Sequence, residues 1–247
     1  MPLKLAAFDL EIAGSIPDDS GRWRDFSPLG ITCAACALGG GSEPRLWQGV
    51  PRLTREEGRG LVRDLMGLVD QGFTLVTWNG CGFDFAVLAE ETGMVDECAE
   101  LAMGHVDMML IVTFTKGHRL ALQTALLGAG LPGKLKAVRL SDGTLVEDMD
   151  GARAPGLWAA GEHEAVLAYL RQDVAQTLEL AHAVLRTKAI RWTSKRGLRQ
   201  QVLCPKLLTA RECLKIPEPD TSWMDAAPKR TDFLDWMPAY AARRGVD

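Results

Sequence analysis

A helical pattern of unusual length, from Glu162 to about Lys188, places the strongest constraint on the fold of this chain. Apolar residues recur along it at the spacing of a helix with one buried face, at positions 166, 167, 170, 174, 178, 181 and 185. The pattern also carries Tyr169 and Asp173, which share a face because they are four residues apart. A carboxylate beside an apolar stripe needs a partner. Either Tyr169 is a core residue and Asp173 is exposed or paired with Arg171, or this face carries a functional site.

The segments before this helix predict a sheet interleaved with shorter helices. Apolar runs predict strands at residues 3–10, 29–38, 45–49 and 74–78. A capping box at Thr54 and helical periodicity predict helices from residue 54 onward and at 83–91, 95–103, 107–115 and 120–127. Residues 133–161 show no regular pattern. This order indicates one α/β domain, residues 1–204, with a mixed sheet flanked by helices.

The composition changes after Cys204, where five prolines alternate with aromatic residues. We interpret residues 205–247 as a C-terminal tail, rich in proline and aromatic residues, that packs on the domain. Trp223, Phe233 and Trp236 are expected to anchor it. The alternative is that these aromatic side chains dock a partner protein.

Composition excludes several classes of protein. Hydrophobic residues make up 47% and charged residues 24%, as in soluble globular proteins. No segment approaches the roughly 18 apolar residues of a membrane span, and no signal peptide is expected. A net charge of −4 argues against a nucleic-acid-coating protein, although a carboxylate site would itself add negative charge. The six cysteines predict reduced thiols and a cytoplasmic protein, with Cys33 and Cys36 on opposite faces of a strand rather than around zinc.

Two acidic motifs precede the long helix. Asp9 and Glu11 lie at the end of the first strand, and both carboxylates project from one face because strand side chains alternate. Paired oxygen ligands of this kind suit Mg²⁺ or Mn²⁺. Asp84 ends the sequence Asn79-Gly-Cys-Gly-Phe-Asp, where a strand turns into a helix. An acid there is either a partner of the helix dipole or part of a site at the end of the sheet.

Three segments, Phe8–Glu11, Asn79–Asp84 and Tyr169–Asp173, together resemble the DEDD superfamily of exonucleases, in the subgroup with a tyrosine in its third motif. Their order and separations agree with that family. So do their predicted locations, which are a strand for the first motif, a strand-to-helix junction for the second and a helix for the third. Residues 1–190 are more narrowly similar to the proofreading exonuclease domain of family-B DNA polymerases, including the segment from Leu120 to Lys134. The resemblance implies a ribonuclease H-like fold.

The resemblance also implies a metal-dependent 3′→5′ exonuclease that removes nucleotides from single-stranded 3′ ends. Two divalent cations, Mg²⁺ or Mn²⁺, would be held by Asp9, Glu11, Asp84 and Asp173. Tyr169 would orient the attacking water, and Asp107 is expected to be structural. The residues that the resemblance places against nucleic acid are Ile12, Asn79 and Phe83.

Residues 186–199 contain six basic residues and no acid, with Trp192 among them. Such a stretch is suited to binding phosphates and stacking a base, and we assign Arg191, Lys195 and Arg196 to nucleic-acid binding. The alternative is that these cations only favour the end of a helix. For the whole chain, DNA is expected in preference to RNA. The other functions considered are an RNA-trimming enzyme and a binding or complex-assembly module that has lost turnover.

Overall fold

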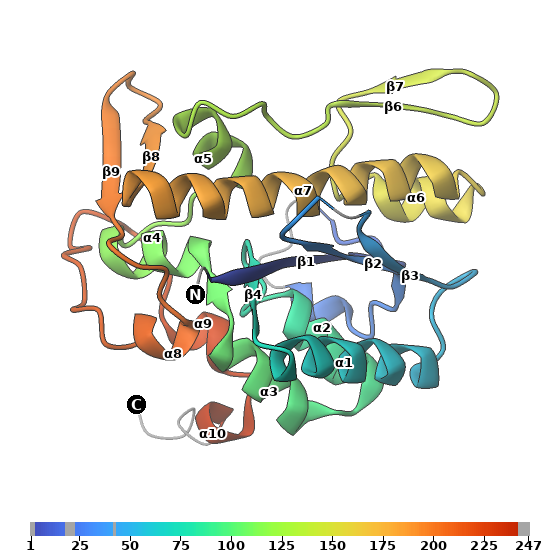
Figure 1. The fold of residues 1–247 in the computed structure, drawn as a ribbon, viewed down its shortest axis with the longest axis horizontal. Coiled ribbons are helices and arrows are strands. Elements are labelled where there is room, and N and C mark those ends of the chain that lie inside the picture. Colours follow the sequence, from blue (N-terminus) through green and yellow to red (C-terminus); the bar gives the residue numbers. More distant parts are fainter. Residues whose placement is uncertain (1–2, 18–22, 42, 242–247) are drawn as a thin grey trace.

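A five-stranded mixed sheet forms the centre of the computed structural model, which describes residues 3–17, 23–41 and 43–241 (Figure 1). The strand order is β3-β2-β1-β4-β5. β1 (Lys4–Ile12) pairs antiparallel with β2 (Ile31–Leu38), which pairs antiparallel with β3 (Arg45–Gln48). On its other side β1 runs parallel to β4 (Phe73–Thr77), and β4 runs parallel to β5 (Val106–Asp107). The four predicted strands are therefore confirmed.

The central strands are buried on both faces, which explains their continuous apolar sequences. Alternation divides their side chains between two cores, one on each side of the sheet. Phe8 and Cys36 belong to one core, and Ala7 and Cys33 belong to the other. The two thiols thus lie on opposite faces as predicted, and all six cysteines are free.

Helices cover both faces of this sheet (Figure 1). α1 (Arg55–Asp70), α2 (Asp84–Thr92) and α3 (Val95–Gly104) lie on one face. The long helix α7 (His163–Thr187) crosses the other face, with α6 (Ala154–Ala159) beside it. α1 begins at the predicted capping box, in which Thr54 and Glu57 accept hydrogen bonds from each other's backbone amides.

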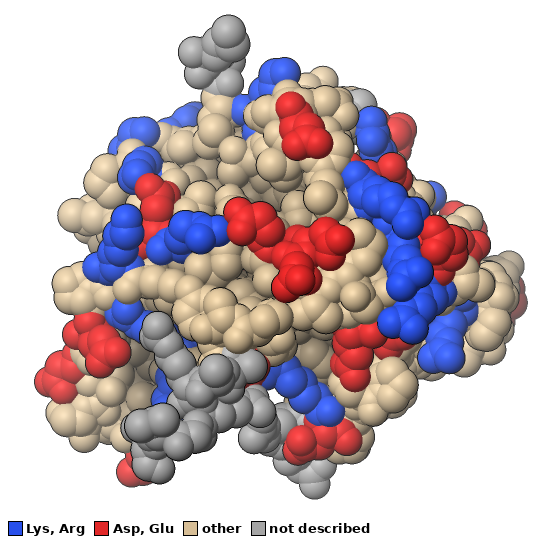
Figure 2. Space-filling model, turned by 90° about the horizontal axis from the view of Figure 1, so that it is seen from below, with Lys and Arg blue, Asp and Glu red and all other residues tan. Residues whose placement is uncertain are grey.

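The remaining elements surround these three layers. They are the 3₁₀ helix η1 (Trp23–Phe26), α4 (Met108–Lys116), α5 (Leu122–Gly128), the paired strands β6 (Ala137–Arg139) and β7 (Leu145–Glu147), the paired strands β8 (Ala189–Thr193) and β9 (Arg199–Leu203), α8 (Ala210–Cys213), α9 (Thr231–Leu234) and α10 (Pro238–Ala241). α5 and the β6–β7 hairpin lie beyond α7, away from the sheet (Figure 1). On the opposite side of the molecule, groups of acidic and basic side chains lie next to one another on the surface (Figure 2).

The interpretation of residues 133–161 as irregular is wrong, because this segment contains the β6–β7 hairpin and α6. Three-residue strands are too short to show alternation, and the hairpin turn at Asp142-Gly143 is its strongest sequence signal.

Two of the three tail aromatics pack as expected. The Phe233 ring is fully buried against Phe114, and Trp236 is largely covered. Trp223 is 68% exposed, so its prediction as an anchor is wrong; its indole only donates to the nearby carbonyl of Asp220. Among the described helices, none combines the length and the apolar character needed to cross a membrane.

Candidate active site

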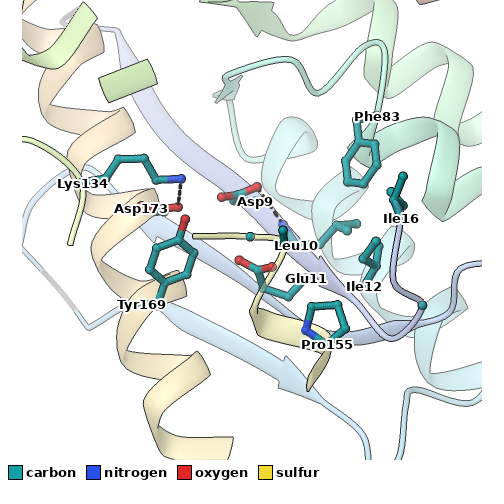
Figure 3. A pocket seen from close by; sticks show the side chains of 13 residues that line it. Asp9, Leu10, Glu11, Ile12, Ile16, Phe83, Lys134, Pro155, Tyr169 and Asp173 are labelled. Carbon is teal, nitrogen blue, oxygen red and sulfur yellow. Dashed lines mark hydrogen bonds and ion pairs between the residues drawn. The ribbon is translucent and has the colours of Figure 1, made fainter. Parts of the chain in front are cut away.

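The three sequence motifs meet in a pocket of about 280 Å³ at the end of β1 (Figure 3). Its walls come from β1 and the loop that follows it, from Phe83 in the turn before α2, from α7, and from two segments of the connection between α5 and α7. Asp9, Glu11, Tyr169 and Asp173 all line this pocket. Residues separated by more than 150 positions in the chain are thus brought to one site, as the motifs predicted.

Asp9 and Glu11 project toward α7 because they share the β1 face that carries Ala7. Glu11 is only 6% exposed, and Asp9 is partly buried. The backbone amide of Leu10 donates to Oδ1 of Asp9 at 3.1 Å and to Oδ1 of Asp84 at 3.2 Å. One amide therefore holds the carboxylates of the first and second motifs together.

Asp84 is the first residue of α2 and is almost fully buried. It is not part of the pocket wall, and it lies behind Asp9, where it accepts the Leu10 amide. Asp84 therefore contacts the cluster from the interior of the protein.

Burial raises the pKa of all three of these carboxyl groups. The pKa of Asp9 rises from 3.8 to about 6, first because of burial and then because of the negative charge of Asp173, while Lys134 opposes the rise. Burial and the neighbouring Asp9 charge raise the pKa of Glu11 and of Asp84 well above their ordinary values. Although the positive charge of Lys134 lowers the pKa of Asp9 and of Glu11, burial outweighs it, and the cluster retains protons to a higher pH than free carboxylates do.

Lys134 is a site residue that the motif analysis did not assign. Its Nζ lies 2.6 Å from Oδ2 of Asp173 and 4.9 Å from the centroid of the Tyr169 ring. Burial disfavours the charged form of Lys134, but the carboxylates of Asp173, Asp9 and Glu11 together outweigh burial, so the pKa of Lys134 is raised. The only sequence signal for this residue was its place at the end of the Leu120–Lys134 segment.

Two glutamines hold the backbone that presents Lys134. Nε2 of Gln176 donates to the carbonyls of Gly133 at 2.6 Å and of Pro132 at 3.3 Å. The amide of Lys134 donates to Oε1 of Gln123 at 2.5 Å. Because Gln176 follows Asp173 on α7 by three residues, the same helix places both the carboxylate and the segment that neutralises it.

Tyr169 is fully buried, and its hydroxyl group lies near the Asp173 carboxylate without meeting the geometry of a hydrogen bond to any described residue. Oδ1 of Asp173 is likewise buried without a partner among the described residues. Burial and the surrounding carboxylates raise the pKa of Tyr169 further above its ordinary value, so the phenol stays protonated. Buried polar atoms without partners indicate a site completed by water, an ion or a substrate.

The donor set fits a hard divalent cation, because its side chains offer only oxygen atoms and carry an excess of negative charge. The free Oδ1 of Asp173 is an available ligand atom. However, no three Asp, Glu, His or Cys side chains within residues 3–17, 23–41 and 43–241 are already arranged to hold a metal ion. Lys134 instead occupies the second oxygen of Asp173, and Asp84 is turned toward the Leu10 amide.

The residues predicted to contact nucleic acid divide into two groups. Ile12 and Phe83 line the pocket. Asn79 does not line the pocket. It lies in the turn before α2 with a φ of 75°, and its backbone amide donates to Oδ1 of Asp107 at 3.0 Å. Asp107 also accepts the amide of Cys81 at 3.1 Å, which agrees with its expected structural role.

The three predicted cations, Arg191, Lys195 and Arg196, lie in the β8–β9 hairpin beyond the end of α7 and are not part of the pocket. Thr187 follows Asp173 by fourteen positions of α7, which corresponds to about 21 Å along the helix axis. Trp192 is only 5% exposed, so the suggestion that it stacks a base is wrong. Alternation along β8 turns its ring inward, toward His118.

Two tryptophans fix the turn that leads into Asp84. The indole of Trp23 donates to the Gly82 carbonyl at 3.2 Å, and the indole of Trp236 donates to the Cys81 carbonyl at 2.9 Å. Trp23 also meets the Phe83 ring edge-on, with the ring centroids 5.1 Å apart. We call Trp23 and Trp236 the indole clamp. It connects the N-terminal loop and the C-terminal tail to the wall of the pocket.

Comparison with solved structures decides the fold. The chain is similar to the family B DNA polymerase from the hyperthermophilic archaeon Pyrobaculum calidifontis, with a TM-score of 0.54 and 21% sequence identity. The similarity covers 75% of this chain. The fold is ribonuclease H-like. A mixed sheet with helices on both faces is thus confirmed as the architecture.

This likeness concerns the fold alone. The matched region spans 25% of the polymerase chain, about a quarter of its length. No protein-family model and no curated protein matches the sequence. The candidate site must therefore be judged on its own geometry and chemistry.

Proposed function

We propose that this protein is a divalent-metal-dependent 3′→5′ exonuclease that acts on single-stranded 3′ ends, with DNA preferred over RNA. The observation that supports this proposal is the convergence of four motif side chains on one pocket, Asp9, Glu11, Tyr169 and Asp173, with Asp84 directly behind. Each motif alone has a structural explanation. Their meeting at a concave site that contains unpartnered buried polar atoms does not follow from those explanations.

Phosphodiester hydrolysis requires an attacking hydroxide, stabilisation of negative charge and help for the departing oxygen. Two bound divalent cations would supply the hydroxide at neutral pH and stabilise the charge. Asp9, Glu11 and Asp173 would hold them from the pocket wall, and Asp84 would complete the set directly or through water. The buried carboxyl groups favour this role because burial makes their uncompensated negative charge costly.

Tyr169 and Lys134 act on water and phosphate in this proposal. A phenol with a raised pKa is a poor base, so Tyr169 orients the attacking water through its hydroxyl group and does not deprotonate it. Lys134 carries the positive charge nearest the carboxylates and is 30% exposed to the pocket, where it attracts the scissile phosphate. Ile12 and Phe83 supply an apolar wall for the terminal base.

A second candidate, a nucleic-acid-binding module without turnover, is favoured by one observation. The ion pair between Lys134 and Asp173 neutralises a carboxylate that the exonuclease needs as a ligand. In such a module Lys134 would hold the third motif permanently. The two functions differ in whether divalent cations displace this ion pair.

The test uses end-labelled single-stranded DNA, duplex DNA and RNA, each incubated with Mg²⁺, Mn²⁺ or chelator. We expect a ladder that shortens from the 3′ end of single-stranded DNA and disappears with chelator. Asp9→Ala should abolish the ladder, whereas Asp142→Ala, a change at an exposed aspartate in the turn of the β6–β7 hairpin that does not line the pocket, should not. Undiminished metal-dependent digestion by Asp9→Ala protein would overturn the proposal. Digestion of RNA alone supports the RNA-trimming alternative, and binding without digestion supports the silent module.

A further inference from the structure

The hairpin after α7 carries a concentration of positive charge that the pocket does not use. We define the basic ribbon as β8, β9 and their flanking turns, with the exposed cations Arg186, Lys188, Arg191, Lys195, Arg196 and Arg199. No acidic residue occurs between positions 180 and 211. Within the described chain, none of these six side chains forms an ion pair.

The charge of the basic ribbon differs from that of the surface beyond the sheet, where cations and acids lie next to one another (Figure 2). Arg63 pairs with Glu56 at 2.9 Å, and Arg211 pairs with Glu100 at 3.0 Å. In a chain of net charge −4, six unpaired cations on one hairpin are not explained by solvation of the surface in general. A single-sign patch of this kind indicates a negatively charged partner.

The basic ribbon has a fixed position relative to the pocket. It continues directly from α7, which carries Asp173, and it packs on α5. A Cβ atom added at Gly128 of α5 would lie 1.9 Å from the carbonyl oxygen of Arg191, so the two backbones are in direct contact. This attachment places the start of the ribbon, at the end of α7, about 21 Å along the helix axis from Asp173.

The register of the strands determines what the ribbon presents to solvent. Arg191 is opposite Gln201, and Thr193 is opposite Arg199, all on the outer face. Trp192 belongs to the inner face and is buried. Besides its cations and polar groups, the ribbon exposes Leu198 and Leu203, but it has no exposed aromatic side chain, whereas proteins that bind single strands stack the bases on aromatic rings.

We propose that the basic ribbon binds the phosphates of double-stranded DNA whose unpaired 3′ end lies in the pocket. This inference rests on the proposed exonuclease function and assigns its substrate as a duplex with a short single-stranded end. At about 3.4 Å for each base pair, 21 Å corresponds to roughly six steps between the pocket and the ribbon. A two-stranded β-ribbon fits the B-DNA major groove, which is about 12 Å wide. The geometry also explains why these cations lie outside the pocket.

The test measures binding in the presence of chelator, so that it does not depend on cleavage. The probes are duplex DNA with a short 3′ overhang and the overhang strand alone, titrated by fluorescence anisotropy over a range of salt concentrations. The ribbon variant combines Arg191→Gln, Lys195→Gln and Arg196→Gln. A matched control variant combines Arg45→Gln, Arg59→Gln and Arg63→Gln on β3 and α1.

The ribbon variant is expected to bind the duplex probe at least tenfold more weakly at low salt. The slope of log K against log salt should decrease by about 0.9 for each lost phosphate contact, or by about two to three in total. The control variant should keep the affinity and the slope of the unchanged protein. Equal losses in both variants, or a loss confined to the single strand, would overturn the inference. If the unchanged protein digests no substrate but the ribbon variant alone loses duplex binding, the exonuclease proposal fails while the ribbon assignment stands.

Discussion

Replacing Asp9 by asparagine should stabilise the protein in the absence of divalent cations. The carboxyl pKa of Asp9 rises from 3.8 to about 6 in the folded protein, mainly because of burial. A shift of this size corresponds to on the order of 3 kcal/mol against the ionised form, and partial exposure of Asp9 to the pocket lowers this to roughly 1–3 kcal/mol. Asparagine has nearly the same shape, can still accept the Leu10 amide, and carries no charge.

The direction in which stability changes with pH depends on whether the folded protein or the unfolded chain binds the Asp9 proton more tightly. The folded protein retains the Asp9 proton to a higher pH than the unfolded chain does. The free energy of unfolding should therefore fall as the pH rises from about 4 to about 6, and the loss is complete at neutral pH. Asp9→Asn removes this contribution, so its stabilising effect should be present at pH 7.5 and absent near pH 4.

Urea denaturation in chelator at both pH values measures this difference. Asp142→Asn is the matched control, because its carboxylate is exposed and accepts a backbone hydrogen bond that lowers its pKa, so no gain is expected. Adding Mg²⁺ or Mn²⁺ should stabilise the unchanged protein, by about 2.7 kcal/mol at a concentration one hundred times the dissociation constant, but not the Asp9→Asn variant. An Asp9→Asn protein that is less stable than the unchanged protein at pH 7.5, or a difference that does not depend on pH, would refute this account of the cluster.

Three further substitutions test contacts around the site. Tyr169→Phe should lower the cleavage rate by up to about a hundredfold while leaving unfolding stability in chelator equal or about 1 kcal/mol higher, because the buried hydroxyl has no partner in the described residues. Trp236→Phe should cost about 1 kcal/mol in urea denaturation and reduce the cleavage rate, because the Cys81 carbonyl loses its indole donor; Trp223→Phe, at an exposed ring, should change neither. Gly128→Ala should lower the free energy of unfolding by roughly 2–4 kcal/mol, because its Cβ would meet backbone atoms of Arg191 and Trp192. Its control is Gly67→Ala, inside α1 with open space around it, which should raise the free energy of unfolding by about 1 kcal/mol.

Each of these substitutions has a contradicting result. Complete loss of folding in Tyr169→Phe would mean that the phenol is a core residue rather than a site residue. Equal effects of the two tryptophan substitutions would show that the indole of Trp236 does not position the turn. A neutral Gly128→Ala would show that α5 and β8 are not in backbone contact.

Long periodic segments could be predicted from the sequence. α7 is long enough to show its 3.6-residue period, and β1 is visible as a continuous apolar run, so the elements that carry Asp173 and Asp9 follow from local pattern alone. The resemblance of the motifs then supplied their meeting. The strands of the short hairpins have too few residues to show a period. The sequence therefore did not reveal that Trp192 lies on the buried face of β8.

Contacts between distant segments could not be predicted. Gln176 and Gln123 hold the backbone from which Lys134 reaches Asp173. The sequence around these residues shows no pattern that would predict the contact. The same holds for the position of Asp84 behind Asp9, where both carboxylates accept the backbone amide of Leu10 in β1. A sequence motif therefore identified the chemical groups, but their partners depended on tertiary structure.

The indole clamp also has a consequence for the order in which the protein matures. Trp236 reaches Cys81 across 155 residues, and Trp23 reaches Gly82 across 59. During synthesis, all four motif carboxylates leave the ribosome well before residue 236 does. Contacts that close such long loops form late, because the entropy of loop closure must be overcome first. The turn before Asp84 thus gains its final geometry only after residue 236 has been synthesised, and a shorter nascent chain would hold every motif residue while the wall of its pocket is still unfinished.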